Sequence, residues 1–166
     1  TLLTEETLSA FEKGKRSLRL NSLQVSIDGS CPEVHDRLRG RGAFEKALKG
    51  LCLASAAGLP VHSRVTVSRF NMDDLENIAR LLLEEIGMDS FSTNEVMPLG
   101  AGCRWEGTLR LTPEQELKVM GVLSGLENRY KGRVTAMAGP LARWRSYRAM
   151  EEARAAGRGG AVNRGF

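Results

Sequence analysis

The stretch LQVSIDGSCPEVHDRLRG, residues 23–40, contains the pattern that decides the fold. Apolar Leu23, Val25 and Ile27 alternate with polar side chains at positions 24, 26 and 28. Such alternation is typical of a β-strand with one buried face. The Asp-Gly pair that follows predicts a turn, and a run of charged residues comes after it. The sequence therefore predicts a strand whose second face is polar.

Helices and further strands are expected to alternate after this first strand. Strands are predicted at residues 23–27, 61–69, 89–96 and 133–137. Helices are predicted over residues 4–13, 43–57, from Asn71 or Asp73 to about 86, 112–128 and 141–156. Thr112 and Pro113 form a helix cap and first helical position. This order is typical of βαβ units that build a parallel sheet.

The polar face of these strands argues against an ordinary doubly wound sheet, whose strands are apolar on both faces. Helices must pack on the apolar side, so the polar side would line the interior of a curved sheet. We therefore predict an α/β fold, a partial (β/α) TIM-like barrel fragment with parallel strands and a polar inner face. An amphipathic sheet with one face in solvent is the alternative. The rim of the barrel would carry the polar residues at the carboxyl ends of the strands: Ser26, Asp28, Thr66, Ser68 and Asn94.

Composition describes a globular chain of ordinary solubility, with 42% hydrophobic and 27% charged residues. No apolar run approaches a membrane span and no signal segment opens the sequence, so we expect a cytoplasmic protein with no membrane partner. Cys31, Cys52 and Cys103 match neither a disulfide framework nor a metal-binding spacing. We read them as reduced thiols, with Cys52 in the core beside Leu48 and Leu51.

The positive charge is concentrated at the C-terminal end of the chain. Residues 129–166 contain nine Lys or Arg and two Glu, whereas the whole chain has a net charge of +4. Such a tail suits nucleic acid or an acidic partner, but Gly-rich basic ends are more often linkers, so no nucleic-acid partner is expected. The predicted divisions are residues 1–128 for the barrel part, 129–156 for a short strand and basic helix, and 157–166 for a Gly-rich linker.

Four motifs in sequence order carry a family resemblance: SIDG, HDRLRG, VTVSRFN and MPLG. With the helices between them, they resemble the second half of the catalytic domain of radical S-adenosylmethionine enzymes. The most similar branch carries an appended cysteine-rich SPASM domain, as in anaerobic sulfatase-maturating enzymes and peptide maturases. The resemblance covers about residues 1–102 and implies a partial (β/α) barrel. It also implies S-adenosylmethionine and a [4Fe-4S] cluster as cofactors, in an oxidoreductase that forms a 5′-deoxyadenosyl radical to abstract hydrogen.

The resemblance also implies roles for individual residues. Ser26 matches the serine that hydrogen-bonds the cofactor, and Arg39 matches the arginine near its methionine part, with Arg37 as the alternative. Val96 matches the position that meets the adenosine through its backbone. The other cofactor-binding candidates are Asp28, Thr66 and Asn94, although an Asx turn is the favoured interpretation of Asp28. His35 is interpreted as a structural hydrogen-bonding residue in preference to a general base.

One feature of the family is absent from this sequence. It contains no Cys-x-x-x-Cys-x-x-Cys loop, so no metal ligand is assigned and the cluster is expected in a parent protein. We therefore expect a fragment, inactive alone, of an enzyme that acts on a peptide, protein or small-molecule cofactor precursor, and the fragment is expected to self-associate. Two other functions stay open. One is a non-catalytic α/β binding module with a basic tail; the other is a barrel enzyme that binds a phosphorylated substrate through Arg37, Arg39 and Arg41.

Overall fold

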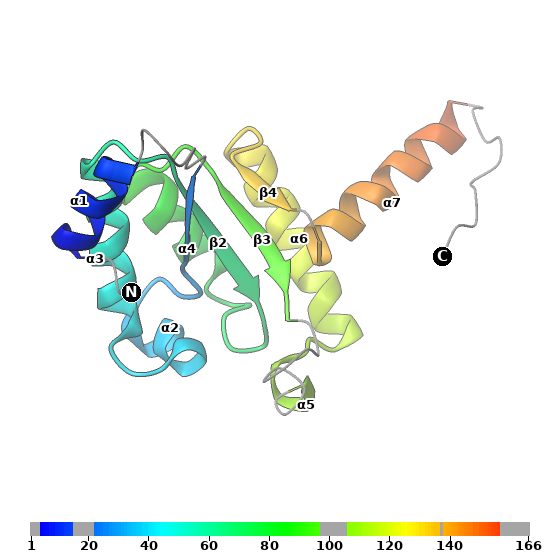
Figure 1. Ribbon diagram of the computed structural model, residues 1–166. Coiled ribbons are helices and arrows are strands. Elements are labelled where there is room, and N and C mark those ends of the chain that lie inside the picture. The colour runs from blue at the N-terminus through cyan, green and yellow to red at the C-terminus, as the bar shows by residue number, and fades with distance from the viewer. Residues whose placement is uncertain (1–3, 15–21, 97–105, 137, 157–166) are drawn as a thin grey trace.

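The computed structural model describes residues 4–14, 22–96, 106–136 and 138–156 (Figure 1). Helices and strands alternate through this part of the chain, as predicted. The elements are α1 (Glu5–Gly14), β1 (Leu23–Ser26), α2 (Pro32–Arg39), α3 (Ala43–Ala56), β2 (Val61–Val67), α4 (Leu75–Arg80), the π-helical segment η1 (Leu81–Glu85), β3 (Phe91–Glu95), α5 (Glu106–Leu109), α6 (Pro113–Arg129), β4 (Val134–Ala136) and α7 (Pro140–Ala155).

The four strands form one parallel sheet in the order β1-β2-β3-β4. Each strand therefore pairs with the next one along the chain, with Leu23 opposite Val61 and Phe91 opposite both Ser63 and Val134. Helices connect each pair of neighbouring strands. A parallel sheet built in chain order in this way is the arrangement of a (β/α) barrel. The fold is α/β, a partial (β/α) barrel as predicted.

Alternate side chains of the strands form the core on one face of the sheet. Val25, Val65, Phe91 and Val134 are buried there, in one cluster with side chains of α3, α4 and α6. Figure 1 shows α4 and α6 passing behind the sheet. Each such buried apolar side chain contributes about 1.5–3 kcal/mol, and a slip of one residue would turn it to the other face. Burial therefore fixes which face of each strand is polar.

The predicted start of helix α6 is confirmed. The Thr112 side chain accepts a hydrogen bond from the backbone N–H of Gln115, and the Gln115 side chain accepts one from the backbone N–H of Thr112. This reciprocal capping box satisfies two N–H groups that the first helical turn leaves free. Pro113 takes the first helical position, where its missing N–H costs nothing.

Helix α2 was not predicted; only a run of charged residues was expected after the Asp-Gly turn. Pro32 begins the helix, Glu33 lies in its first turn, and Arg37 and Arg39 lie in its last turn. Acidic residues at the start and basic residues at the end both favour the helix dipole. The two arginines are therefore positioned by a helix and do not belong to a solvated loop.

The expected start of the next helix was also wrong. Helix α4 begins at Leu75, with Asp74 as its N-cap, and not at Asn71 or Asp73. Asn71 is fully buried and its side chain bonds to the ends of two strands. The Asn71 side chain therefore stabilises the turn after β2 and is not available to cap a helix.

The prediction of a core position for Cys52 was wrong, because the residue is exposed. The inward face of α3 is formed by Ala47, Leu51 and Ala54. Each residue turns the helix by about 100°, so the side chain that follows Leu51 leaves the core. Leu48, which was used to place Cys52, is itself only partly buried.

Strands β1 and β4 are the two edges of the sheet in the described residues. Strand β4 continues the sheet beside β3, and α7 packs against α6 and both of these strands. From there α7 extends away from the sheet (Figure 1). The residues expected to form the Gly-rich linker, 157–166, lie outside the described part of the chain.

Candidate functional site

The face of the sheet opposite the core carries polar side chains in rows that cross the strands. Ser26, Arg64 and Ser92 occupy one row, because Arg64 is opposite both of the others in the parallel register. Thr66 and Asn94 form the next row toward the carboxyl ends of the strands. The side chains of Ser26, Thr66 and Asn94 are partly exposed. The predicted polar face is confirmed.

An ion pair lies at the carboxyl end of this face. Arg39 Nε donates a hydrogen bond to Asp28 Oδ2 at 2.5 Å, and the backbone N–H of Thr66 donates to Asp28 Oδ1 at 2.6 Å. Arg39 Nη2 lies 3.5 Å from Thr66 Oγ1. The two carboxylate oxygens of Asp28 therefore link the end of β1 to α2 and β2. The Asx turn expected for this residue is not formed, because both oxygens are used in these contacts. Three predicted site residues, Asp28, Arg39 and Thr66, meet here.

The two members of this pair differ in their access to solvent. The Asp28 side chain is 1% exposed, whereas that of Arg39 is 40% exposed. A carboxylate as buried as this one requires partners for its charge, and Arg39 and the Thr66 N–H supply them. The guanidinium keeps its remaining N–H groups at the surface, where they are available to a ligand.

His35 supports the turn that holds Asp28. Its Nδ1 accepts a hydrogen bond from the backbone N–H of Asp28 at 3.0 Å, and its ring contacts the edge of Phe44. Burial is the main cause that lowers the pKa of His35, with the Arg39 charge acting in the same direction and Asp28 opposing it. A neutral, buried imidazole that accepts a hydrogen bond fits the predicted structural role.

Gly29 brings the start of α2 close to the end of β1. A Cβ atom at this position would lie 2.4 Å from the backbone N of His35 and 2.8 Å from Cβ of Val34. Any side chain at residue 29 would therefore push α2 away from the strand. Because α2 carries Arg39, this close approach sets where the guanidinium lies.

Sequence reasoning missed the part that Asn71 plays in the site. Its Nδ2 donates to the carbonyl oxygens of Asp28 at 3.0 Å and of Thr66 at 2.9 Å, and its Oδ1 accepts from the N–H of Ser68 at 2.8 Å. The amide thus ties the carboxyl ends of β1 and β2 together. Ser68, expected at an open rim, is fully buried and also bonds to Asn71. The only sequence signal was an amide four residues after the strand.

A second cluster of charge lies at the carboxyl end of β3. Arg143 of α7 donates to both carboxylate oxygens of Glu95, at 2.9 and 2.7 Å, and also pairs with Glu116. The hydrogen bond from Arg143 is the main cause that lowers the pKa of Glu95. Val96 lies beside this cluster, in a cavity of about 180 Å³ that also contacts Val67. Val96 and Asn94 therefore lie on β3 or at its end, two strands away from Ser26.

These residues suit S-adenosylmethionine and do not suit an iron–sulfur cluster. A partly exposed guanidinium, a hydroxyl at Ser26 and a small cavity at Val96 match a ligand that has a carboxylate, a ribose and a base. Within the described residues, no group of three His, Cys, Asp or Glu side chains is arranged to hold a metal ion. No step of the chemistry is therefore assigned to a cluster bound by these residues.

Comparison with known proteins identifies the family. Residues 1–82 match the family model described as the Radical SAM superfamily. The chain is 34% identical over 103 residues to an AdoMet-dependent heme synthase of Methanosarcina barkeri, covering 61% of this chain and 28% of that protein. It is 27% identical over 133 residues to a PqqA peptide cyclase of Ruegeria pomeroyi, covering 74% and 34%. It is 33% identical over 95 residues to a mycofactocin maturase of Mycolicibacterium smegmatis, covering 57% and 24%.

Residues 1–82 are a radical SAM domain, and the enzymes of this superfamily use S-adenosylmethionine and a [4Fe-4S] cluster. This confirms the resemblance found in the sequence, and a peptide cyclase and a maturase are among the relatives. The chain spans about a quarter to a third of the length of these relatives. In the described part of the chain, no helix combines the length and the apolar character that crossing a membrane requires.

Proposed function

We propose that this chain forms part of the catalytic barrel of a radical SAM enzyme that acts on a peptide, a protein or a cofactor precursor. The single observation that carries this proposal is the Asp28–Arg39 pair at the carboxyl ends of parallel strands, inside the family-matched range. Ligands of barrel and open α/β sheets bind at that end of the strands. The names of two relatives, a peptide cyclase and a mycofactocin maturase, support a peptide or cofactor precursor as substrate.

In this proposal, each site residue binds or orients S-adenosylmethionine. Arg39 binds the carboxylate of its methionine part, and Ser26 hydrogen-bonds a cofactor oxygen. Asp28 positions Arg39 by occupying its Nε. The backbone at Val96 meets the adenosine, and Thr66 and Asn94 supply polar contacts between these two ends of the site. When cleaved reductively, S-adenosylmethionine supplies a 5′-deoxyadenosyl radical that abstracts hydrogen from the substrate.

The cluster is proposed to come from another part of the parent protein, because this sequence contains no cluster-binding loop and the matches cover only about a third of the relatives' length. A phosphate-binding barrel enzyme has less support. Asp28 already balances the charge of Arg39, and Arg37 lies 4.3 Å above the ring of Phe70. The remaining N–H groups of Arg39 suffice for hydrogen bonds to a carboxylate, but the pair offers less uncompensated positive charge than a phosphate dianion requires.

The test compares Ser26→Ala and Arg39→Ala in the full-length gene product that contains this chain. Ser26→Ala should weaken binding of S-adenosylmethionine by about 0.5–1.5 kcal/mol, and Arg39→Ala by roughly 1.5–3 kcal/mol, because a charged donor is lost. Anaerobic cofactor binding and 5′-deoxyadenosine production are the two measurements. Both variants should fold, since neither side chain lies in the core.

Arg37→Ala is the matched control, because it removes an arginine from the same helix. It should leave cofactor binding close to the wild type. A folded Arg39→Ala protein with unchanged affinity and turnover would remove Arg39 from the site. If Arg37→Ala caused the loss instead, the two arginines would exchange their proposed roles.

A further inference from the structure

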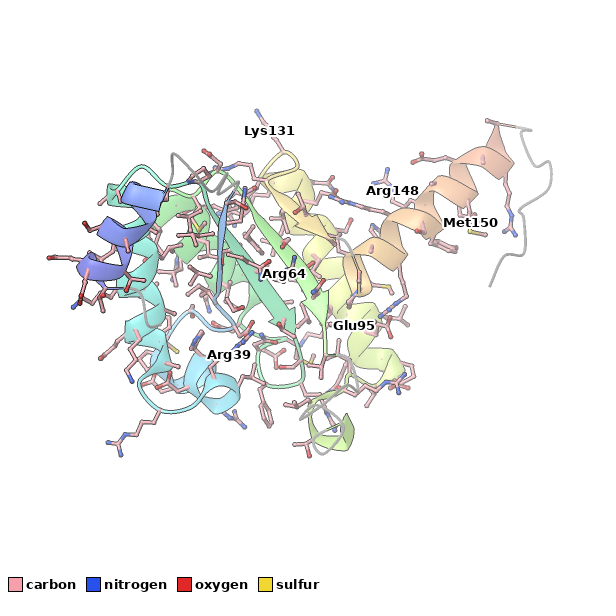
Figure 2. All side chains as sticks on the ribbon, viewed as in Figure 1. Arg39, Arg64, Glu95, Lys131, Arg148 and Met150 are labelled. Atoms are coloured by element: carbon pink, nitrogen blue, oxygen red, sulfur yellow. The ribbon has the colours of Figure 1, made fainter. Side chains whose placement is uncertain are left out.

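Arg64 lies in the middle of the polar face, beside Ser26 of the proposed cofactor site, and has no role in that site. It is the central member of the row formed with Ser26 and Ser92. Figure 2 shows its side chain over the sheet, higher in the view than the labelled Arg39 and Glu95. Arg64 precedes Thr66 by two residues, which places it roughly 7 Å farther from the carboxyl end of β2. It therefore lies deeper in the barrel interior than Arg39.

One donor of the Arg64 guanidinium, its Nε–H, lacks a partner among the described residues, unlike several other arginines. Its Nε is buried and has no hydrogen-bond acceptor among the described residues. Arg39, by contrast, donates to Asp28, Arg143 to Glu95, and Arg145 to Glu127. A guanidinium donor withdrawn from water without an acceptor costs free energy. The unpaired Nε–H of Arg64 therefore carries a free-energy cost. A ligand that accepts a hydrogen bond from this group would offset that cost.

A cavity of about 290 Å³ lies next to this side chain. Polar side chains of all four strands line it, among them Gln24, His62, Arg64, Ser92 and Thr135. Of the lining residues, all in the described part of the chain, only Arg64 is a lysine or arginine, and none is an aspartate or glutamate. The cavity thus offers one permanent positive charge beside hydroxyl, amide and imidazole groups.

We propose that Arg64 binds a carboxylate of the substrate in this cavity. A guanidinium presents paired N–H groups that match the two oxygens of a carboxylate. One guanidinium also balances the single charge of a carboxylate, whereas a phosphate dianion would call for a second cation. This inference rests on the proposed function only because it calls the ligand a substrate. The substrate would then be an acidic molecule, such as a peptide that contains a glutamate or an aspartate.

The test follows the Nε–H resonance of Arg64 by NMR, in this chain and in the full-length gene product. Arg64→Lys assigns the resonance by its loss. The probes are N-acetylglutamate N-methylamide and N-acetylglutamine N-methylamide, which differ only in carboxylate against amide. The acidic probe should shift the Arg64 resonance in a saturable way, and the amide should bind roughly tenfold more weakly or not at all, as expected when a charged partner is lost. Arg80, an exposed arginine paired with Glu85, is the matched control and should show no such difference.

Several outcomes would overturn the inference. Equal shifts at Arg64 and Arg80 would show non-specific attraction. If inorganic phosphate bound more tightly than the acidic probe, the cavity would favour phosphate and not a carboxylate. Displacement of the acidic probe by S-adenosylmethionine would assign Arg64 to the cofactor. Binding by this chain but not by the full-length protein would show that another protein segment already pairs with Arg64. None of these results depends on radical formation, so a failure here is distinct from a failure of the proposed function.

A second variant separates a binding role from a structural one. Arg64→Met keeps the length of the apolar stem and removes the charged donor. If the guanidinium of Arg64 serves ligand binding and not folding, this variant should be as stable to urea as the wild type, or more stable. Its response to the acidic probe should be lost. A marked loss of stability in Arg64→Met would show that the guanidinium serves the fold, and would contradict the inference.

Discussion

Asp28 connects three segments through one buried side chain. Its carboxylate accepts from Arg39 of α2 and from the Thr66 N–H of β2, and its own N–H donates to His35. Removing the carboxylate would leave the Thr66 N–H without its acceptor and Arg39 without its counter-charge. The position of the proposed cofactor-binding arginine therefore depends on a residue that need not touch the cofactor.

We expect Asp28→Ala to lower the free energy of unfolding by about 1–3 kcal/mol, because a buried N–H loses its partner. Asp28→Asn keeps an acceptor for Thr66 and should recover part of this loss. Urea denaturation measures both. The control is Asp73→Ala, whose 73% exposed side chain pairs with Lys118 and should cost only about 0–1 kcal/mol. Equal losses at the two positions would show that the buried contacts of Asp28 contribute nothing special.

His35 makes stability depend on pH. Burial lowers its pKa from the ordinary value of 6.5, and its Nδ1 must stay unprotonated to accept from Asp28 N–H. The unfolded chain therefore takes up a proton below about pH 6.5 while the folded chain resists it. The contribution of His35 to stability is complete above that pH and is lost as pH falls from the unfolded pKa toward the folded one.

Urea unfolding at about pH 7.5 and about pH 5.5 tests this expectation. The wild type should lose stability between these two values, and His35→Gln should show a smaller dependence on pH. His62→Gln, at an exposed strand position, should keep the wild-type dependence. A pH dependence that persists unchanged in His35→Gln would assign the effect to other groups.

At the scale of elements, the turn after β2 decides how two strands end together. Asn71 bonds the carbonyl oxygens of Asp28 and Thr66 and the N–H of Ser68, all through one amide. Parallel neighbours cannot be joined by a tight hairpin, so their ends need contacts of this kind. The side chains at those ends, including the Asp28–Arg39 pair, take their spacing from it.

Asn71→Ala should lower the free energy of unfolding by about 2–3 kcal/mol, since three backbone groups, buried or partly buried, lose a partner. In the full-length protein it should also weaken cofactor binding, because Arg39 would lose its fixed position. Asn77→Ala is the control: Asn77 is exposed, bonds only the Asp74 side chain among the described residues, and should change stability by no more than about 0.5 kcal/mol. A fully stable Asn71→Ala protein would show that the turn holds without the amide.

At the scale of the whole molecule, the edge strand β1 matters most. The N–H groups of Leu23 and Ile27 donate toward β2, to the carbonyl oxygens of Pro60 and Arg64. Alternation along the strand then directs the N–H of Gln24 to the open side. An open edge invites pairing with another chain, so we expect self-association of the isolated chain.

Gln24→Pro tests this expectation by removing the outward N–H without touching a bond to β2. Sedimentation velocity over a range of concentrations should show dimers or larger species for the wild type and for Gln24→Ala, and monomers for Gln24→Pro. Circular dichroism checks that all three remain folded. A monomeric wild type at every concentration, or association that persists in Gln24→Pro, would contradict pairing through β1.

The sequence by itself determined the order of the four strands and of the longer helices, although not α2 or α5, and it determined the two faces of the sheet. Alternation at Val25, Val65 and Phe91 predicted which side chains enter the core, and Thr112 and Pro113 predicted the start of α6. These features depend on residues close together in the chain, so a local pattern is enough to reveal them. Four short motifs also sufficed to recognise the family.

Only the tertiary structure decided which polar groups meet. Asp28 finds Thr66 across 38 residues and Asn71 across 43, and no local spacing encodes those contacts. The same holds for Arg64, whose unpaired Nε follows from which residues the parallel register places beside it. Hydrogen bonds require positions within fractions of an ångström, whereas burial requires only the correct face. The sequence therefore predicted which face of each strand is buried. The hydrogen-bond partners of the polar side chains could be identified only from the paired strands of the structure.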